Sequence, residues 1–399
     1  VKCSRYIRSA LDPKFIDKAA SFIEQEFKKI GLKPLTGLKG FQQEFKKEKV
    51  IPLTASVIID GETIPYENFI VISEKKELEI DGDIVVKTIP FDSKASDKGR
   101  HYFRRQAFKL IRDTVPALVL VAQEYEKEFA LLKNRFGQRF VGGKVVNTIF
   151  VLGKKSATKF KVRATQKLEI VTLRNIVGVL EGTTKKEEYV VFGAHYDHVG
   201  ILKKKIKGDS IANGADDDAS GVAAVITLAR YYKKIKNNNR TLIFVAFTAE
   251  EVGGFGSQHF SKQLNPDKVI TMFNIEMIGK PSKWGLNNAF VTGYERSDFG
   301  KILQNNLKGT QYHFWPDPYP EYNLFYRSDN ATLARLGVPA HSISTNQIDN
   351  DKFYHTVDDE VESLDFKNIT TTIKAIAISG KSIIDGIDTP KRIDKSKVY

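Results

Sequence analysis

The chain has 399 residues, of which 41% are apolar, and it carries a formal net charge of +14. This length is sufficient for one large domain and a smaller one. No run of about 18 apolar residues occurs, which excludes a membrane-spanning helix. The lysines lie scattered in segments such as KKEKV and LKKKIKGD, and no nucleic-acid-binding motif accompanies them. We therefore expect solvated loops and helix ends, and no nucleic-acid partner.

The start of the chain bears on where the protein resides. The sequence begins at Val1 without Met, so we expect that an upstream segment has been removed. Cys3 is the only cysteine, which rules out an internal disulfide. Cys3 is then either a lipidation site or an incidental free thiol.

The first predicted element is a helix from Pro13 to about Ile30. Asp12 suits the N-cap and Pro13 the first helical position, and Gly31 suits the C-terminal stop. Apolar residues recur between them at helical spacing. The segment FQQEFKKE that follows is typical of an exposed strand.

Residues 51–165 differ in character from the rest of the chain. They hold short alternating strand candidates, a basic helix candidate and an apolar strand candidate, in this order: SVIID, NFIVI, DIVVKTI, HYFRRQAFKLIRD and ALVLVA. This pattern predicts a small inserted α+β domain with its own core. The main domain would then comprise residues 1–50 and 166–399.

From about residue 168 onward the pattern is α/β. Apolar strand candidates alternate with the helix candidate GVAAVITLARYYKKI and a last long helix, and the run TLIFVAF is typical of a strand covered on both faces. The alternation predicts a three-layer αβα fold around a mostly parallel mixed sheet. Ligands in such folds bind outside the carboxyl ends of the strands, where His195, Glu251 and Glu276 are expected.

Five residues far apart in the chain form a candidate metal-ligand set: His195, Asp216, Glu251, Glu276 and His355. Imidazole and carboxylate groups are zinc ligands, and five of them suit two ions that share a bridging carboxylate. Three consecutive carboxylates, Asp216, Asp217 and Asp218, repel one another unless a cation is present, so one of the three should bridge the ions. Asp218 is also explained as a helix-start residue.

The neighbours of these residues are candidates for other roles. Side chains that follow one another at a strand end diverge, so Glu251 is assigned to the metal and Glu250 to proton transfer. Asp197 can orient the imidazole of His195 with its carboxylate. His198 is interpreted as a loop residue near the pocket.

The ordered segments HYDHVG, GADDDASGVAAV, FTAEEVGGFGS, NIEMIG and YHTVDD resemble the di-zinc exopeptidases of metallopeptidase family twenty-eight. The resemblance covers roughly Asn175 to Ile384. It implies the zinc-exopeptidase fold and two zinc ions, for which cobalt or manganese can substitute. It also implies that one zinc is held by His195 and Glu276 and the other by Glu251 and His355, with Asp216 as the bridge.

The same resemblance has further implications. Glu250 would be the general base and acid, and the Asp216–Asp217 peptide bond would be cis. Many relatives carry Asp in place of Glu276, and the segment that often reads Ser-Asp-His is Ser328-Asp329-Asn330 here. The insert resembles a protease-associated or apical domain, and an exported protein is expected, whether periplasmic, secreted or lipid-anchored.

The function that this resemblance implies is a zinc aminopeptidase that acts on peptides. A carboxypeptidase, dipeptidase or glutaminyl cyclase-like activity on the same site is the alternative. Arg327 and Tyr354 are candidate substrate-binding residues; Arg327 can pair with a substrate carboxylate, or it makes a structural ion pair. A non-catalytic, receptor-like binding protein is the alternative of another class, and the intact set of five ligands speaks against it.

Overall fold

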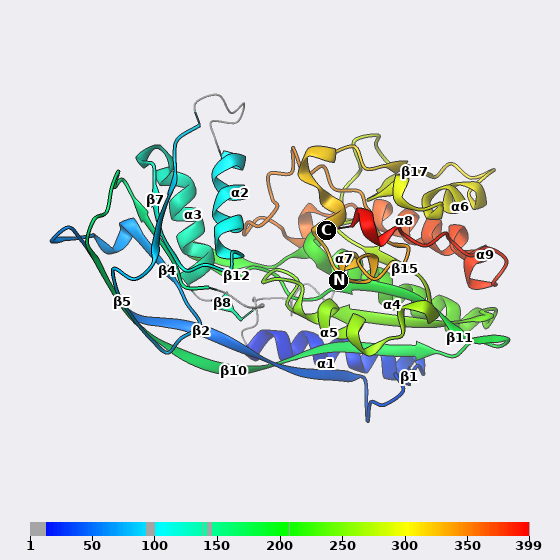
Figure 1. The fold of residues 1–399 in the computed structure, drawn as a ribbon. Coiled ribbons are helices and arrows are strands. Elements are labelled where there is room, and N and C mark those ends of the chain that lie inside the picture. Colours follow the sequence, from blue (N-terminus) through cyan, green and yellow to red (C-terminus); the bar gives the residue numbers. More distant parts are fainter. Residues whose placement is uncertain (1–12, 93–99, 138, 142–145, 207, 399) are drawn as a thin grey trace. The chain divides into compact units, whose positions relative to one another are not determined.

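A computed structural model describes residues 13–92, 100–137, 139–141, 146–206 and 208–398, so that Cys3 and Asp12 lie outside the described residues. The chain forms two compact units (Figure 1). The smaller unit is Lys46–Thr172, whereas the sequence predicted residues 51–165. The main unit comprises the parts of the chain that precede and follow it. No described helix is long and apolar enough to cross a membrane.

The main unit is built on a mixed sheet whose strands run in the order β17-β16-β18-β15-β11-β14-β10. The neighbours β14, β11, β15 and β18 are parallel to one another, whereas β10 and β16 run antiparallel to their neighbours β14 and β18. The bounds are β10 (Phe160–Leu180), β11 (Lys185–His195), β14 (Arg240–Phe247), β15 (Val269–Ile275), β16 (Asn288–Val291), β17 (His313–Pro316) and β18 (Ala340–Ser344). The short β1 (Lys33–Pro34) pairs with β10.

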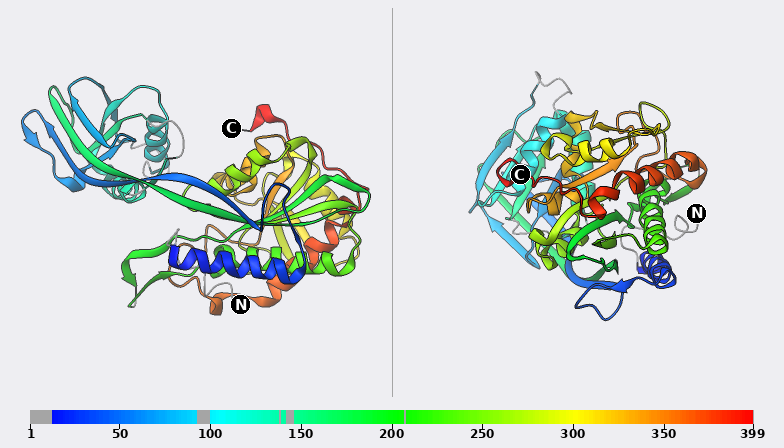
Figure 2. Two further views of the ribbon diagram at one scale, coloured as in Figure 1. Left: turned by 90° about the horizontal axis from the view of Figure 1, so that it is seen from below. Right: turned by 90° about the vertical axis from the view of Figure 1, so that its right-hand side faces the viewer.

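Helices cover both faces of this sheet, which confirms the three-layer αβα architecture. One apolar core joins the sheet to α1 (Pro13–Ile30), α4 (Gly221–Ile235), α6 (Phe299–Asn306), α8 (Phe366–Ser379) and α9 (Lys381–Ile384). A second core on the opposite face includes α5 (Phe255–Gln263) and α7 (Asn330–Ala334). Figure 2 shows α1 and α4 side by side in the first of these layers.

The smaller unit has a four-stranded sheet in the order β4-β9-β7-β6. Its helices α2 (Arg100–Ile111) and α3 (Glu126–Gly137) share one apolar core with the sheet, and β2, β5 and β10 share another with it. The strands are β2 (Gln42–Ile59), β3 (Glu62–Thr63), β4 (Phe69–Ile72), β5 (Glu77–Asp81), β6 (Val85–Ile89), β7 (Ala117–Val121), β8 (Arg139–Phe140) and β9 (Thr148–Leu152). The unit is therefore α+β, with a core of its own.

Two segments differ from the sequence-based expectation. The strand that begins in FQQEFKKE continues to Ile59, because its alternating pattern persists through the expected domain boundary. The lysine-rich segment LKKKIKGD, expected as a solvated loop, belongs to a hairpin of β12 (Gly200–Ile206) and β13 (Asp209–Ala212). In β12 the side chains of Ile201 and Lys205 are exposed.

Candidate metal centre

The candidate site lies at the carboxyl ends of three adjacent parallel strands. His195 is the last residue of β11 and pairs in register with Phe247, the last residue of β14. Glu250 and Glu251 follow β14 after a short turn, and Glu276 directly follows β15. Because β11 lies between β14 and β15, the sheet itself brings these side chains together.

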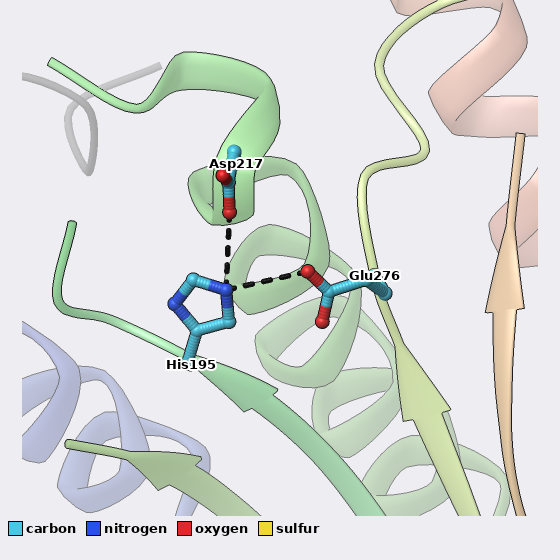
Figure 3. Close-up of side chains that lie close together, drawn as sticks. All are labelled: His195, Asp217 and Glu276. Carbon is cyan, nitrogen blue, oxygen red and sulfur yellow. Dashed lines mark hydrogen bonds and ion pairs between the residues drawn. The ribbon is translucent and has the colours of Figure 1, made fainter. Parts of the chain in front are cut away.

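His195, Asp217 and Glu276 form the first cluster (Figure 3). The Nε2 atom of His195 lies 3.1 Å from Asp217 Oδ1 and 3.3 Å from Glu276 Oε1. The other ring nitrogen, Nδ1, lies 2.9 Å from the backbone carbonyl of Asp197, to which it donates when protonated. This bond leaves Nε2 as the atom that faces the two carboxylates.

A second cluster forms around the other oxygen of Asp217. The Nε2 atom of His355 lies 3.2 Å from Asp217 Oδ2 and 3.2 Å from Glu251 Oε2. His355 takes a left-handed backbone conformation, with a φ of 59°. Asp217 thus presents one oxygen to each of two histidines, which is the arrangement of a shared carboxylate ligand.

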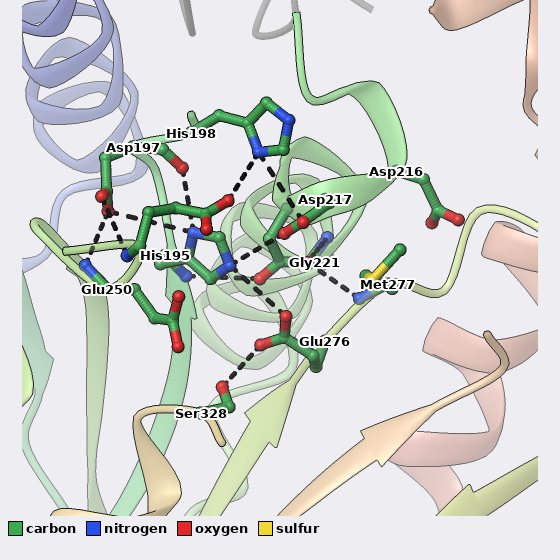
Figure 4. A network of polar contacts seen from close by, with 12 residues as sticks. His195, Asp197, His198, Asp216, Asp217, Gly221, Glu250, Glu276, Met277 and Ser328 are labelled. Atoms are coloured by element: carbon green, nitrogen blue, oxygen red, sulfur yellow. Dashed lines mark hydrogen bonds and ion pairs between the residues drawn. The ribbon is translucent and has the colours of Figure 1, made fainter. Parts of the chain in front are cut away.

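The structure does not bring Asp216 into either cluster. Figure 4 shows Asp216 pointing away from the histidines. Its Oδ1 atom accepts a 2.7 Å hydrogen bond from the Gly279 amide, and its Oδ2 atom lies 3.4 Å from Lys280 Nζ. Lys280 also contacts Asp351 Oδ2 at 2.8 Å. Asp216 therefore connects loops around the site, and the shared carboxylate that we expected of it comes from Asp217.

The backbone of residues 214–221 explains this one-residue shift. Gly214 is left-handed, and the cis peptide bond joins Asp217 to Asp218, one residue later than expected. The Asp218 carboxylate turns back onto the backbone, where Oδ1 accepts hydrogen bonds from the Gly221 and Met277 amides at 3.1 and 3.0 Å. The three aspartates consequently point in three directions, and of the three only Asp217 faces the imidazole rings of His195 and His355.

Asp197 holds the turn that carries the two glutamates. Its carboxylate accepts hydrogen bonds from the backbone amides of Glu250 and Glu251, at 3.0 and 3.3 Å. It lies 3.9 Å from His195 Nδ1, so the imidazole is oriented by the Asp197 carbonyl and not, as expected, by the carboxylate. Ala249, with a φ of 60°, completes the turn that separates the two glutamates.

Glu250 is not engaged by the protein. Within the described part of the chain its carboxylate accepts no hydrogen bond, and its side chain extends toward the part of the site where Glu276 lies (Figure 4). Burial raises the pKa of Glu250 well above its usual range, and the carboxylates of Glu251 and Glu276 raise it further, against the opposing effect of His195. A free carboxyl with a raised pKa suits proton transfer near neutral pH.

The segment Ser328-Asp329-Asn330 supports Glu276. The hydroxyl of Ser328 donates a 2.6 Å hydrogen bond to Glu276 Oε2. Asn330 donates to the carbonyls of Phe325 and Ala340 at 3.0 and 3.3 Å, so it stabilises the chain around α7 and does not reach the clusters. Asp329, between Ser328 and Asn330 in the sequence, is buried.

A cavity of about 60 Å³ lies beside Glu276. Both substrate-binding candidates from the sequence, Arg327 and Tyr354, line it. Apolar side chains of Phe290, Leu324 and Ile348 line it as well. Asp359 accepts hydrogen bonds from the backbone amides of Asp216 and Asp217.

The donor atoms suit zinc. Four tetrahedral ligands at zinc–ligand bond lengths of 2.0–2.1 Å lie about 3.3 Å apart, close to the 3.1–3.3 Å separations in both clusters. Glu251 Oε1 is buried without a hydrogen-bond partner among the described residues, which a cation would supply. Burial opposes charge on His355, yet Asp217 and Glu251 raise the pKa of this imidazole to about 10. The carboxylates of Asp217 and Glu251 therefore favour a positive charge at this position, which a zinc ion would supply.

Comparisons with known proteins identify the family and the relatives of this chain. A family profile described as Peptidase family M28 matches residues 175–378, about half of the chain. Leucine aminopeptidase 1 of Ajellomyces capsulatus (strain H88) is 31% identical over 206 residues, which cover 49% of this chain and 52% of that protein. The chain spans about half the length, or less, of the curated relatives it matches.

Two solved structures share the fold over the whole chain. The aminopeptidase from Aneurinibacillus sp. strain AM-1 has a TM-score of 0.59 and 18% identity, with 100% of this chain and 93% of that chain covered. A zinc aminopeptidase from Bacillus subtilis has a TM-score of 0.59 and 15% identity, with 100% and 94% covered. At these identities the likeness concerns the fold alone.

Proposed function

Because the chain belongs to peptidase family M28, we propose that it is a zinc-dependent aminopeptidase that removes N-terminal residues from peptides. The observation that carries the proposal is the position of Asp217 between His195 and His355, with the unengaged Glu250 beside them. The name of the Ajellomyces capsulatus relative, leucine aminopeptidase 1, supports the same activity.

Two zinc ions are proposed, with cobalt or manganese as possible substitutes. His195 and Glu276 would hold one ion, Glu251 and His355 the other, and Asp217 both. Zinc bound there would polarise the scissile carbonyl and lower the pKa of the attacking water. Ser328 fixes Glu276, and the carbonyl of Asp197 fixes His195, so that the ligand atoms are oriented in advance.

Glu250 is the proposed general base and acid. Its carboxylate takes a proton from the water as the water oxygen forms a bond to the peptide carbonyl carbon. The same carboxyl then gives the proton to the amide nitrogen as the carbon–nitrogen bond breaks, and the shortened peptide leaves as an amine. The hydrogen bonds from Glu250 and Glu251 to Asp197 keep the base beside the ligand cluster.

The exopeptidase character follows from the surroundings of Glu276. The carboxylates of Glu250 and Glu276 can bind a free α-ammonium group, which an internal peptide bond lacks. The apolar side chains of Phe290, Leu324 and Ile348 would contact the first side chain of the substrate.

Arg327 favours a second candidate, a carboxypeptidase or dipeptidase. Arg327 lines the cavity and makes no ion pair among the residues that the structure describes. Its guanidinium can bind a substrate carboxylate in a bidentate manner. We also propose that unit Lys46–Thr172 is a protease-associated domain and that the protein is exported.

Peptides of one sequence with either end blocked separate these activities. Digestion is followed by mass spectrometry with zinc and after chelation. For an aminopeptidase we expect release of N-terminal residues from free and C-amidated peptides, no release from N-acetylated peptides, and no release after chelation. Cleavage that requires a free carboxyl terminus would establish the second candidate instead. Cleavage unaffected by chelation would refute both.

A further inference from the structure

His198 is a buried histidine that the proposed mechanism does not use. It lies in the loop after β11, with 0% of its surface exposed. Neither of its ring nitrogens has a hydrogen-bond partner among the described residues. A buried polar group without a partner is destabilising, so an imidazole in this position requires another interaction.

The ring of His198 points into the second cluster. Its Nδ1 atom lies 2.8 Å from Glu251 Oε1 and 3.7 Å from Asp217 Oδ2. The contact with Glu251 is short, yet neither His198 Nδ1 nor Glu251 Oε1 has a hydrogen-bond partner among the described residues. A ring nitrogen and a carboxylate oxygen that lie this close together without a hydrogen bond between them are typical of two ligands of one metal ion.

His198 completes a set of donors on the side of the site opposite to Glu276. The nitrogen of His198 and the carboxylates of Asp217 and Glu251 have ligand atoms within 4.8 Å of one another. His355 contacts the same two carboxylates, and its ring meets that of His198 edge to face, with centroids 5.5 Å apart. His198 and His355 therefore both contact the carboxylates of Asp217 and Glu251.

The chain makes room for this imidazole. A Cβ atom on Gly214 would lie 2.6 Å from Cγ of His198, and Gly214 also takes a left-handed conformation, with a φ of 64°. Gly214 directly precedes the segment that carries Asp217. The glycine thus lets the ligand loop and the imidazole pack against each other.

We propose that His198 is an additional ligand of the second metal ion, bound through Nδ1. The inference rests on the metal centre proposed above. It makes the two positions unequal, because the ion near Glu276 has one histidine and the ion near Glu251 has two. The extra imidazole should strengthen zinc binding at the second position.

Zinc affinity tests the assignment without reference to catalysis. The variant His198→Gln is compared with His313→Gln, which changes an exposed histidine in β17, by competition with a chromophoric chelator. We expect two zinc ions in wild type and His313→Gln, and a second ion bound at least about tenfold more weakly in His198→Gln. Unchanged affinity in a folded His198→Gln variant would overturn the proposal and leave the proposed function intact. A wild type that binds no zinc would instead refute the proposed function.

A second measurement uses the unmodified protein, so it does not depend on the folding of a variant. Proton NMR of the cobalt-loaded protein resolves the exchangeable ring protons of metal-bound histidines. Three such signals are expected, from His195, His198 and His355. Two signals would overturn the proposal, since they would leave His198 outside the coordination sphere.

Discussion

Asp216 and Asp217 are adjacent, identical and both buried, yet they have different surroundings. Asp217 faces the histidines, whereas Asp216 faces a backbone amide and Lys280. Asp217→Asn replaces one oxygen of the shared carboxylate with an amide nitrogen that cannot bind a cation, so we expect it to bind fewer zinc ions than wild type. Asp216→Asn makes the same change in charge but keeps an oxygen for the Gly279 amide, and should retain both ions.

Metal analysis after dialysis against zinc buffered at a fixed free concentration compares these two variants. Circular dichroism shows whether each variant is folded. Retention of both ions by Asp217→Asn, together with loss from Asp216→Asn, would restore the assignment that the sequence suggested.

The sequence could place the shared carboxylate within three residues but could not select among them. The repulsion between Asp216, Asp217 and Asp218 indicated a cation without showing which side chain faces it. Their directions depend on the left-handed Gly214 and the irregular backbone of residues 215–220, and residue periodicity does not determine such dihedral angles. The role of His198 was missed for a similar reason, because its burial follows from loop packing.

Glu250 allows chemistry to be separated from metal binding. Glu250→Gln keeps the size of the side chain but cannot accept the proton, and Glu250 is not among the proposed ligands. We expect both zinc ions to be retained and kcat to fall on the order of a hundredfold or more. The control is Glu295→Gln, whose native side chain is 75% exposed, and which should keep normal kcat. Near-normal turnover by Glu250→Gln would remove Glu250 from the mechanism.

At the scale of elements, the strands that carry the site were predictable. The apolar runs that end at His195 and before Glu250 and Glu276 are strands β11, β14 and β15, because strands covered on both faces have continuous apolar sequences. The lengths of β2 and β10, 18 and 21 residues, were not predictable. Both strands run through both compact units. Along β10, Val162 joins an apolar core of the smaller unit, whereas Ile176 joins the core of the main unit.

His341 makes the stability of β18 sensitive to pH. His341 belongs to β18, and its buried ring stacks on the Phe299 ring with the two ring centroids 5.0 Å apart. The Nδ1 atom of His341 lies 2.8 Å from the Thr292 carbonyl oxygen. Burial lowers the pKa of His341 to about 4. As the pH falls below about 6.5, the unfolded chain binds a proton that the folded chain excludes, so the free energy of unfolding decreases. Between pH 7.5 and 5.0 this decrease amounts to about 2 kcal/mol.

His341→Asn removes the titrating group and tests this effect. Urea unfolding of the zinc-free main unit can be followed by the fluorescence of Trp284 and Trp315, which stack 5.3 Å apart in that unit. The loss of stability on acidification should be about 2 kcal/mol greater in wild type than in the variant. Equal losses would show that His341 is protonated in the folded state.

At the scale of the whole molecule, a chain with a net charge of +14 has most of the buried acidic side chains of its described residues around one site. The carboxylates of Asp217, Glu251 and Glu276 lie close together at the edge of the main sheet, and His195 and His355 lie between them. Without a cation, folding must bring these negative groups together against their mutual repulsion. The metal should therefore contribute to the stability of the folded chain as well as to its activity.

Chelation should accordingly lower the melting temperature of the protein. A ligand that binds only the folded state stabilises it by about 2.7 kcal/mol at a concentration one hundred times its dissociation constant, which corresponds to several degrees. Differential scanning calorimetry of the zinc-loaded and chelated protein measures the shift. In Asp217→Asn the shift should be smaller, because that variant binds fewer ions. If chelation removes the zinc but leaves the melting temperature of wild type unchanged, the ligand cluster is assembled by the fold alone and gains no stability from its ions.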